Sequence, residues 1–403
     1  MLKKKNKKIF EIDGIKLSSV HSGMYSKKRL DLSIMCINTN SVVSGVFTKN
    51  KAKSSTIIIS QENLKKMMPK YIIVNSGNAN AGTGSDGYKD IMTYSNALAN
   101  KAKCSTDQIL IFSTGVIGER IKVNNIIKSM PKLLSNLKGD KWEDFSKSIL
   151  TTDTNNKIVS KNLKIKGKQV KITGVSKGSG MIQPNMATML SFVATDIRIK
   201  KTTLSKILKK VTDSSYNMIS VDGETSTNDA SLLVATCENN VDYDKLSFKD
   251  QNIFYNTLEQ VYIDLAKEII KDGEGATKFI TININNASSQ KESKNIAMSI
   301  ANSPLVKTAL FAEDPNWGRI LSAVGNAETK LKDLTKIKIS LGKFLVFKNN
   351  KIYKNYIEKN CKKYLKNKNI SINIDCANGK YNSTAWTTDL SYEYIKINAD
   401  YRT

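Results

Sequence analysis

Short strand-like segments that end in glycine-rich loops alternate with helical segments along this chain, and this alternation constrains its fold most. The segment YIIVNSG (71–77) has the apolar run of a buried strand, and ILIFSTG (109–115) repeats the pattern after a helical segment, 89–103. Residues 163–175 alternate apolar and polar side chains about Gly167, as the two strands of a hairpin do. Strands and helices mixed in this way predict an α/β fold built from mixed α and β layers.

The length of the chain, 403 residues, exceeds the size at which single cores usually stop growing, so we expect two domains. Apolar residues recur with helical spacing from Leu204 to Val211, and Thr202 or Thr203 stands where the N-cap of such a helix is expected. We place a structural domain boundary near residue 200.

No stretch of the chain approaches the roughly 18 uninterrupted apolar residues that a membrane-spanning helix needs. The basic N-terminal segment, residues 1–17, is followed by neither an apolar core nor a small-residue cleavage site, so no secretory signal is expected. We therefore expect a cytoplasmic protein.

The cysteines and the single histidine exclude several kinds of site. The five cysteines are odd in number and never spaced as CxxC, which argues against a disulfide framework and against a zinc ribbon. His21 is the only histidine, so a Ser-His-Asp triad, a Cys-His pair or a multi-histidine metal site would have to use it. We expect chemistry that needs neither histidine nor a metal ion, with His21 as a surface or turn residue.

The net charge of +27 would suit a protein that binds nucleic acid. The lysines are spread along the whole chain, however, together with many asparagines and isoleucines, which indicates compositional drift. Local clusters occur only at 3–8 and 361–369, and neither is interleaved with several aromatic residues as a base-stacking surface would be. A solvated basic surface is the preferred interpretation, and nucleic-acid binding stays as an alternative.

Polar or glycine-rich loops follow many of the strand-like segments. Each loop alone is more often a tight turn than a ligand site. The GSG at 178–180 lacks the spacing of a dinucleotide fingerprint, and no GxxxxGK[ST] motif occurs, so phosphate cofactors have no support. The loops are NSGNANAGTG (75–84), STGVIGE (113–119), TTDT (151–154), KGSGMIQPNMAT (177–188), VDGETSTND (221–229), DGEGATK (272–278) and EDPNWGR (313–319).

The loop at 177–188 ends in a threonine that could act without histidine. A threonine at a chain N-terminus uses its own α-amine, with an unperturbed pKa near 8, as general base. To free that amine, the hydroxyl of Thr188 would attack the carbonyl of Ala187, and water would hydrolyse the resulting ester. Pro184 and the glycines Gly178 and Gly180 could strain the backbone before that bond, although the same residues also suit a plain turn into a core strand. A glycine turn such as Thr114-Gly115 could supply the oxyanion hole.

The segment KGSGMIQPNMATMLSFVATD closely resembles the self-cleavage segment of the ornithine acetyltransferase family, the glutamate N-acetyltransferases of arginine biosynthesis. The loops NSGNANA, STGVIGE, TTDT, VDGETSTND, GEGATK and EDPNWGR, and the C-terminal INADYRT, resemble that family in the same order. The resemblance covers nearly the whole chain, and several long motifs in order are far more specific than any one of them.

The resemblance implies a two-domain self-cleaving fold and a precursor that splits between Ala187 and Thr188. The products would be an α chain, 1–187, and a β chain, 188–403. Thr188 would take the acetyl group from N-acetylornithine, release ornithine, and pass the acetyl group to glutamate in a ping-pong cycle. The family also implies no cofactor, leaves open acetyl-CoA as a co-substrate, and suggests an α2β2 heterotetramer.

Site residues are carried over by motif, and each has a structural alternative. Lys177 could pair with a substrate carboxylate or be solvated, and Glu274 could bind a substrate ammonium group or be a capping carboxylate. The C-terminal tail would usually fray, so its use in the site requires that it be pinned. The implied set is the nucleophile Thr188, the oxyanion residues Thr114 and Gly115, and the substrate-binding residues Thr151, Lys177, Thr188, Glu274, Asn398 and Thr403.

The chain departs from the family pattern at two places. Asn155 and Asn156 follow TTDT where phenylalanine and proline are usual, which makes the placement of Thr151 less secure. Gly82 follows NSGNANA where a bulkier residue or cysteine is common. Neither change touches Thr188 or the proposed oxyanion turn.

An alternative enzyme class is an autoprocessed aminopeptidase of related fold, which would pass the acyl group to water. A remoter alternative is a basic nucleic-acid-binding protein, which would stay uncut and bind in a strongly salt-dependent way.

Overall fold

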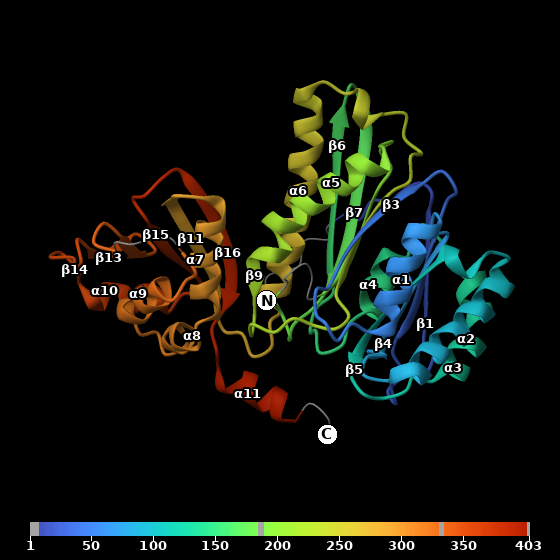
Figure 1. Cartoon of the computed structure of the whole chain (residues 1–403), viewed down its shortest axis with the longest axis horizontal. Helices are drawn as coiled ribbons and strands as arrows, with labels where there is room; N and C mark the ends of the chain where they lie inside the picture. The colour runs from blue at the N-terminus through green and yellow to red at the C-terminus, as the bar shows by residue number, and fades with distance from the viewer. Residues whose placement is uncertain (1–7, 184–188, 330–333, 401–403) are drawn as a thin grey trace. The chain divides into compact units, whose positions relative to one another are not determined.

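The computed structural model describes residues 8–183, 189–329 and 334–400 (Figure 1). The described chain divides into two compact units. The first comprises residues up to Gly178, Pro184–Asn217 and Thr225–Ala266, and the second comprises Ser179–Gln183, Met218–Glu224 and the chain from Lys267 onward.

The first unit contains two sheets that share one core. In the first sheet the strand order is β1-β2-β4-β5, and in the second it is β3-β10-β8-β7-β6. The strands are β1 (Ile15–Val20), β2 (Leu32–Ile37), β3 (Val42–Phe47), β4 (Tyr71–Asn78), β5 (Ile109–Val116), β6 (Lys157–Ile165), β7 (Lys168–Lys177), β8 (Leu190–Thr195) and β10 (Ala230–Ala235).

Alternating side chains of β4 and β5 explain the layers of this unit. Ile72 and Phe112 point into a core shared with the second sheet, where Phe112 packs edge-to-face with Phe192 of β8. Ile73 and Ile111, on the opposite face of the same strands, join a core formed with α2 (Gly84–Ala102) and α3 (Val123–Ser135). Both faces of the first sheet are therefore covered, as the continuous apolar runs of β4 and β5 require.

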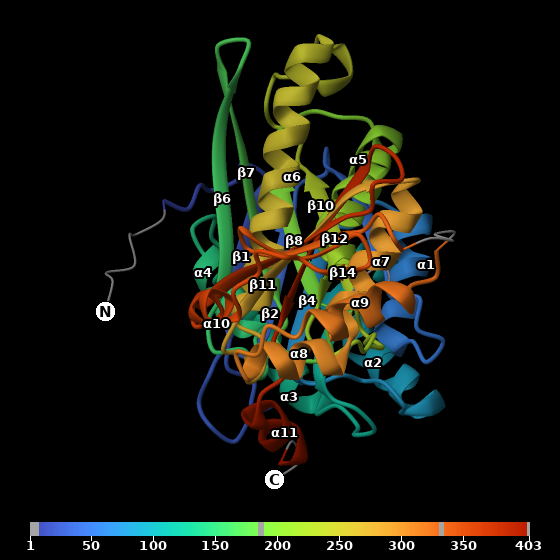
Figure 2. The same cartoon turned by 90° about the vertical axis from the view of Figure 1, so that its left-hand side faces the viewer.

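The helices of the first unit pack on both of its sheets. Figure 2 shows the hairpin β6–β7 alongside α6, and a Cβ at Gly174 of β7 would come within 3.1 Å of Leu265 of α6. The helices are α1 (Ser55–Lys66), α2 (Gly84–Ala102), α3 (Val123–Ser135), α4 (Trp142–Ser148), α5 (Lys201–Ser214) and α6 (Phe248–Lys271), the last of which continues into the second unit.

The second unit is built on a third sheet with strand order β14-β13-β12-β15-β11-β16-β9. Ile280, Ile282 and Ile284 of β11 are fully buried and alternate with polar residues, and α7 packs against β11 and β16. The elements are β9 (Ile219–Ser220), β11 (Phe279–Ala287), β12 (Lys338–Leu341), β13 (Phe344–Lys348), β14 (Lys351–Ile352), β15 (Asn369–Asp375), β16 (Tyr381–Thr388), α7 (Gln290–Asn302), α8 (Pro304–Phe311), α9 (Trp317–Gly325), α10 (Glu358–Leu365) and α11 (Tyr392–Ala399).

Mixed α and β layers agree with the predicted fold class. The hairpin about Gly167 is present as β6 and β7, and Gly167 has a φ of +81°, the left-handed conformation that favours glycine at a tight turn. The last break between the two units falls after Ala266, within α6, and the boundary near residue 200 stays a prediction. The change of pattern near residue 200 is the start of α5, which packs against β3 of the first unit.

The expected cap of α5 was wrong. The helix begins at Lys201, and its N-cap, Lys200, makes no side-chain cap bond. The Asp244 side chain binds the start of the helix instead. Its carboxylate accepts hydrogen bonds from the Lys200 N–H at 2.8 Å and from the Thr203 hydroxyl at 2.6 Å.

No helix in the described part of the chain is both long and apolar enough to span a bilayer.

Candidate functional site

Lys177, the last residue of β7, brings two predicted site residues together in the first unit. Its Nζ donates a hydrogen bond to Oγ1 of Thr114, in β5, at 3.0 Å. It donates a second to Oγ1 of Thr151, which follows α4, at 2.9 Å. Because Lys177 and Thr114 are each only 9% exposed, this is a buried polar contact and not a solvated surface pair.

Asp153, which was not among the predicted site residues, completes this cluster. Its Oδ1 accepts hydrogen bonds from Lys157 Nζ at 2.6 Å and from the Gly178 N–H at 2.7 Å, while Lys177 Nζ lies 4.0 Å from Oδ2. Burial would raise the pKa of Asp153, but the two ammonium groups and the Gly178 N–H outweigh it and lower the pKa to about 2. Asp153 is therefore ionised at neutral pH. We call Thr114, Thr151, Asp153, Lys157 and Lys177 the lysine cluster.

Asp229, just before β10, is a second buried carboxyl near Lys177. Its Oδ2 has no hydrogen-bond partner within the described residues. Burial raises the pKa of Asp229 well above the usual carboxyl value, against the attraction of Lys177. The lysine cluster thus places two lysine side chains beside the ionised Asp153, and a lysine ammonium group suits a substrate carboxylate or a developing oxyanion.

Gly115 forms a turn that only glycine can form. Its φ is +133°, and a Cβ there would lie 2.3 Å from the carbonyl carbon of Gly77 and 2.5 Å from the backbone nitrogen of Asn78. The pairing of β4 with β5 shifts register at Gly77 and Asn78. The backbones of the loops that follow β4 and β5 therefore lie in direct contact at the ends of these strands, with no side chain between them.

Asparagine side chains hold the Thr114-Gly115 turn in place. Nδ2 of Asn228 donates to the carbonyl oxygens of Ala79 and Ser113, at 2.6 and 2.9 Å, and so ties the loops after β4 and at the end of β5 together. Ser113 Oγ donates in turn to Oδ1 of Asn75 at 2.7 Å. Buried, satisfied amides of this kind make the turn rigid before any ligand arrives.

Glu274 and Asn398 meet in the second unit. Asn398 Nδ2 donates to Oε2 of Glu274 at 3.1 Å, and the Glu274 N–H donates to the carbonyl oxygen of Ser179 at 2.9 Å. Position 180 requires glycine, because the Cβ of any other residue would lie 2.3 Å from Oε2 of Glu274. Glu274 is 8% exposed, so its carboxylate is a positioned group and not a solvated one.

Helix α11, which carries Asn398, is attached to the Glu274 loop at its N-terminus. Ser391 is the N-cap of α11, and its Oγ donates to the carbonyl oxygen of Gly275 at 2.6 Å. Gly275 has a φ of +65°, and a Cβ there would lie 2.3 Å from the Tyr394 nitrogen. The segment predicted to be a tail is helical up to Ala399 and is anchored next to Glu274.

Three predicted residues lie outside the described residues: Ala187 and Thr188 at the predicted cleavage site, and the terminal Thr403. The structure brings Thr114, Thr151 and Lys177 together in one unit, with Gly115 adjoining Thr114, and Glu274 and Asn398 together in the other.

His21 contacts Arg29 and Asp31. Its Nδ1 lies 2.8 Å from the carbonyl oxygen of Arg29 and 3.3 Å from Oδ2 of the buried Asp31. Asp31 also accepts hydrogen bonds from the N–H groups of Gly23 and Met24, at 3.1 and 3.0 Å. His21 thus belongs to a network that orders the loop after β1.

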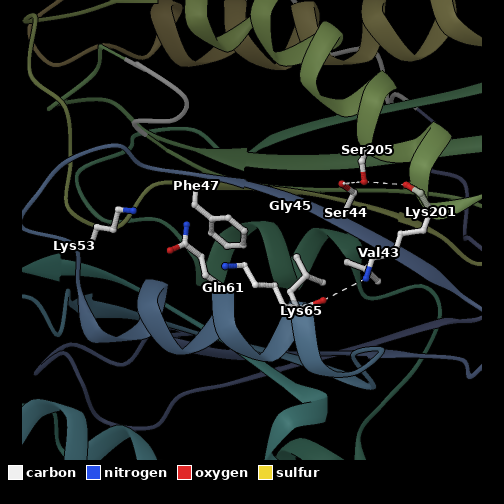
Figure 3. A pocket seen from close by; sticks show the side chains of 10 residues that line it. Val43, Ser44, Gly45, Phe47, Lys53, Gln61, Lys65, Lys201 and Ser205 are labelled. Carbon is white, nitrogen blue, oxygen red and sulfur yellow. Dashed lines mark hydrogen bonds between the residues drawn. The ribbon is translucent and has the colours of Figure 1, made fainter.

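No cluster of three or more His, Cys, Asp or Glu side chains in the described ranges could hold a metal ion. A pocket of about 520 Å³ lies at the edge strand β3, between α1 and the start of α5 (Figure 3). Lys53, Lys65 and Lys201 line it together with Phe47 and Gln61, and no acidic residue does. It contains none of the predicted site residues.

The residues that sequence reasoning missed are Asp153, Lys157, Asn228 and Asp229. Asp153, Asn228 and Asp229 lie within motifs already recognised, TTDT and VDGETSTND, so selecting every polar residue of those motifs would have found them. Lys157 lies outside the motifs. The pairing of β6 with β7 places Lys157 opposite Ser176, and this pairing brings Lys157 close to Lys177.

Comparisons with known proteins agree with the motifs. The family model described as ArgJ family matches residues 16–403. The arginine biosynthesis bifunctional protein ArgJ of Psychrobacter arcticus is 42% identical over 98% of this chain and 97% of its own length. The protein of the same name from Oceanobacillus iheyensis is 40% identical over 99% and 97%.

Among solved structures, the arginine biosynthesis bifunctional protein argJ of Bacillus halodurans is 36% identical and aligns with 53% of this chain and 99% of the solved chain, with a TM-score of 0.49. Because the family model and the full-length relatives cover nearly every residue of this sequence, the chain belongs to the ArgJ family.

Proposed function

We propose that this ArgJ-family chain is an acyltransferase of arginine biosynthesis that moves an acetyl group from N-acetylornithine to glutamate through an acetyl-threonine intermediate. The observation that carries this proposal is the lysine cluster, in which Lys177 joins Thr114 and Thr151 beside a glycine-only turn. Both substrates carry an α-carboxylate, and Lys177 is the proposed partner of that group.

The nucleophile of the proposal is produced by self-cleavage. The hydroxyl of Thr188 attacks the carbonyl carbon of Ala187, the peptide C–N bond breaks, and the nitrogen leaves as the α-amine of Thr188 with the hydroxyl proton. Water then hydrolyses the ester to free the hydroxyl and the carboxylate of Ala187. The chain lacks any second histidine that could form a conventional triad, and the new α-amine replaces it as general base.

In the transfer reaction, the α-amine accepts the hydroxyl proton while the oxygen attacks the acetyl carbonyl. Donors at the Thr114-Gly115 turn stabilise the oxyanion, and ornithine leaves as the amine. The neutral α-amine of glutamate then attacks the acetyl carbonyl, the ester bond to the Thr188 oxygen breaks, the proton that the amine loses returns to that oxygen, and N-acetylglutamate leaves. Glu274, held by Asn398, accepts hydrogen bonds from the side-chain ammonium group of N-acetylornithine.

The enzyme of this proposal acts in the cytoplasm without a bound cofactor, as an α2β2 assembly of the two chains. Acetyl-CoA is a second acetyl donor to be tested. Release of CoA thiol on incubation with acetyl-CoA and glutamate, without N-acetylornithine, would show that it is used.

Intact mass spectrometry of the purified protein and of its Thr188→Ala variant tests self-cleavage. The wild type is expected as fragments of 187 and 403 − 187 = 216 residues, and the variant as one chain of 403 residues. A folded wild-type chain that stays whole would contradict the mechanism.

The acceptor is tested on the cleaved enzyme. Ornithine released from N-acetylornithine only when glutamate is present identifies the transferase. Release of ornithine at the same rate in water alone would identify the aminopeptidase alternative. An uncut chain that binds RNA or DNA in a salt-dependent way would identify the nucleic-acid-binding alternative.

A further inference from the structure

The turn at Val221–Glu224 holds the chain just before the predicted cleavage segment. Oδ2 of Asp222 accepts a hydrogen bond from the Met181 N–H at 2.6 Å, and Oδ1 accepts one from the Ile182 N–H at 2.8 Å. One carboxylate therefore binds two successive peptide N–H groups.

Backbone hydrogen bonds extend this contact to the next residue. The Val221 N–H donates to the carbonyl oxygen of Ile182 at 2.7 Å, and the Gln183 N–H donates to the carbonyl oxygen of Glu224 at 2.8 Å. Gln183 is four residues before Ala187. We call Met181, Ile182 and Gln183 the lead-in.

The lead-in does not have a relaxed conformation. Met181 has a φ of +55°, in the left-handed region that residues other than glycine rarely adopt. Its side chain is 42% exposed, so side-chain burial does not account for that conformation. The hydrogen bond from its own N–H to Asp222 is a contact that can hold this conformation.

The carboxylate of Asp222 is fully used as an acceptor. Oδ1 also accepts the Glu224 N–H at 3.2 Å, and Oδ2 accepts the hydroxyl of Tyr394 at 3.3 Å. Each oxygen faces a donor on the lead-in, so an amide in place of the carboxylate would turn its NH2 group toward one of these donors, whichever way it was rotated.

We propose that Asp222 is a positioning residue for self-cleavage, which fixes the lead-in so that the Ala187–Thr188 bond is presented to the Thr188 hydroxyl. This inference rests on the proposed function, because it assumes that the bond is cut. Intramolecular attack needs a near-attack geometry, and a chain that is free on the upstream side of the bond reaches that geometry less often. Asp222 removes that freedom at two peptide units.

Full-length chains translated in a cell-free system test the proposal, with cleavage followed after a pulse of labelled amino acid. Asp222→Asn is expected to slow cleavage at least tenfold while its melting temperature stays within about 2 °C of the Thr188→Ala precursor. Glu224→Gln is the matched control, because the Glu224 contacts to the lead-in and to Asp222 are made by its backbone atoms. It is expected to cleave at the wild-type rate.

Tyr394→Phe is the second variant. It removes one hydrogen bond to Oδ2 and leaves the carboxylate in place, and it is expected to slow cleavage about threefold. Once cleavage of Asp222→Asn is complete, its kcat is expected within twofold of the wild type, because the residue acts on the precursor.

Equal cleavage rates for Asp222→Asn and Glu224→Gln would overturn the inference and leave the proposed function standing. A Tyr394→Phe rate equal to the wild type, with Asp222→Asn unfolded, would overturn it too. A wild-type chain that stays whole in the same experiment would contradict self-cleavage itself.

Discussion

Nζ of Lys177 lies 3.0 Å from Oγ1 of Thr114, although the two residues are 63 positions apart. This contact joins the end of β7 to the end of β5, and so joins the two sheets of the first unit at one edge. A lysine at that point places positive charge beside the glycine turn that is proposed to stabilise the oxyanion.

Gly115→Ala is expected to lower kcat at least 100-fold. The added Cβ would lie 2.3 Å from the Gly77 backbone, so the turn must move away from its present position. Gly118→Ala is the control in the same loop, because Gly118 has a φ of +87° but no atom within 4 Å of its Cβ position. It is expected to cost about 1 kcal/mol of stability with kcat nearly unchanged. Similar kcat values for both variants would contradict the role of the turn.

Asp153→Asn is expected to lower the free energy of unfolding by about 3 kcal/mol, because it removes the buried carboxylate that pairs with Lys157 and lies 4.0 Å from Lys177. Glu143→Gln, which breaks an exposed pair with Lys147, is expected to change it by less than about 0.5 kcal/mol. Urea unfolding of both variants provides the comparison.

The pH dependence of the Asp153 contribution has a definite sign. Its pKa is lowered to about 2 in the fold, so the stabilisation is fully present above the unfolded value near 4 and is lost as the pH falls toward 2. The wild type is expected to lose stability between pH 4 and 2 more steeply than Asp153→Asn. Parallel curves would contradict the assignment.

Lys307, on α8, is expected to make stability rise with pH. Burial lowers its pKa to about 7, against the attraction of Asp389 and Asp222. Between pH 7 and 10 the unfolded chain therefore binds the proton that the folded chain has released, so the free energy of unfolding rises with pH, by at most about 1.4 kcal/mol per pH unit. Lys307→Met is expected to lack this rise, and the exposed Lys291→Met to keep it. Urea titrations at pH 7, 8.5 and 10 measure the difference.

Asn398→Ala is expected to raise KM for N-acetylornithine about tenfold with kcat changed less than threefold. The substitution removes the amide that holds Glu274 and so loosens the proposed ammonium site. Lys396→Ala, on the same helix and exposed, is the matched control and is expected to leave KM unchanged. A tenfold loss in kcat at constant KM would instead assign Asn398 to the chemical step.

Local patterns predicted the elements that depend on local forces. The apolar runs at 71–77 and 109–115 are β4 and β5, and the hairpin about Gly167 is β6 and β7. The cap of α5 was wrong because its acceptor, Asp244, lies 44 residues from Lys200 and enters only through the fold. A cap from a distant segment leaves no local signal.

The sequence by itself determined the family, the mixed α/β class and the exclusion of histidine-rich chemistry, because these depend on which residues are present and in what order. It also selected Thr114, Thr151 and Lys177 as candidates. Only the tertiary structure decided that these three share one hydrogen-bonded cluster with Asp153 and Lys157. The charge state and the cost of a buried ionic group depend on its neighbours in space, and strand pairing sets those neighbours.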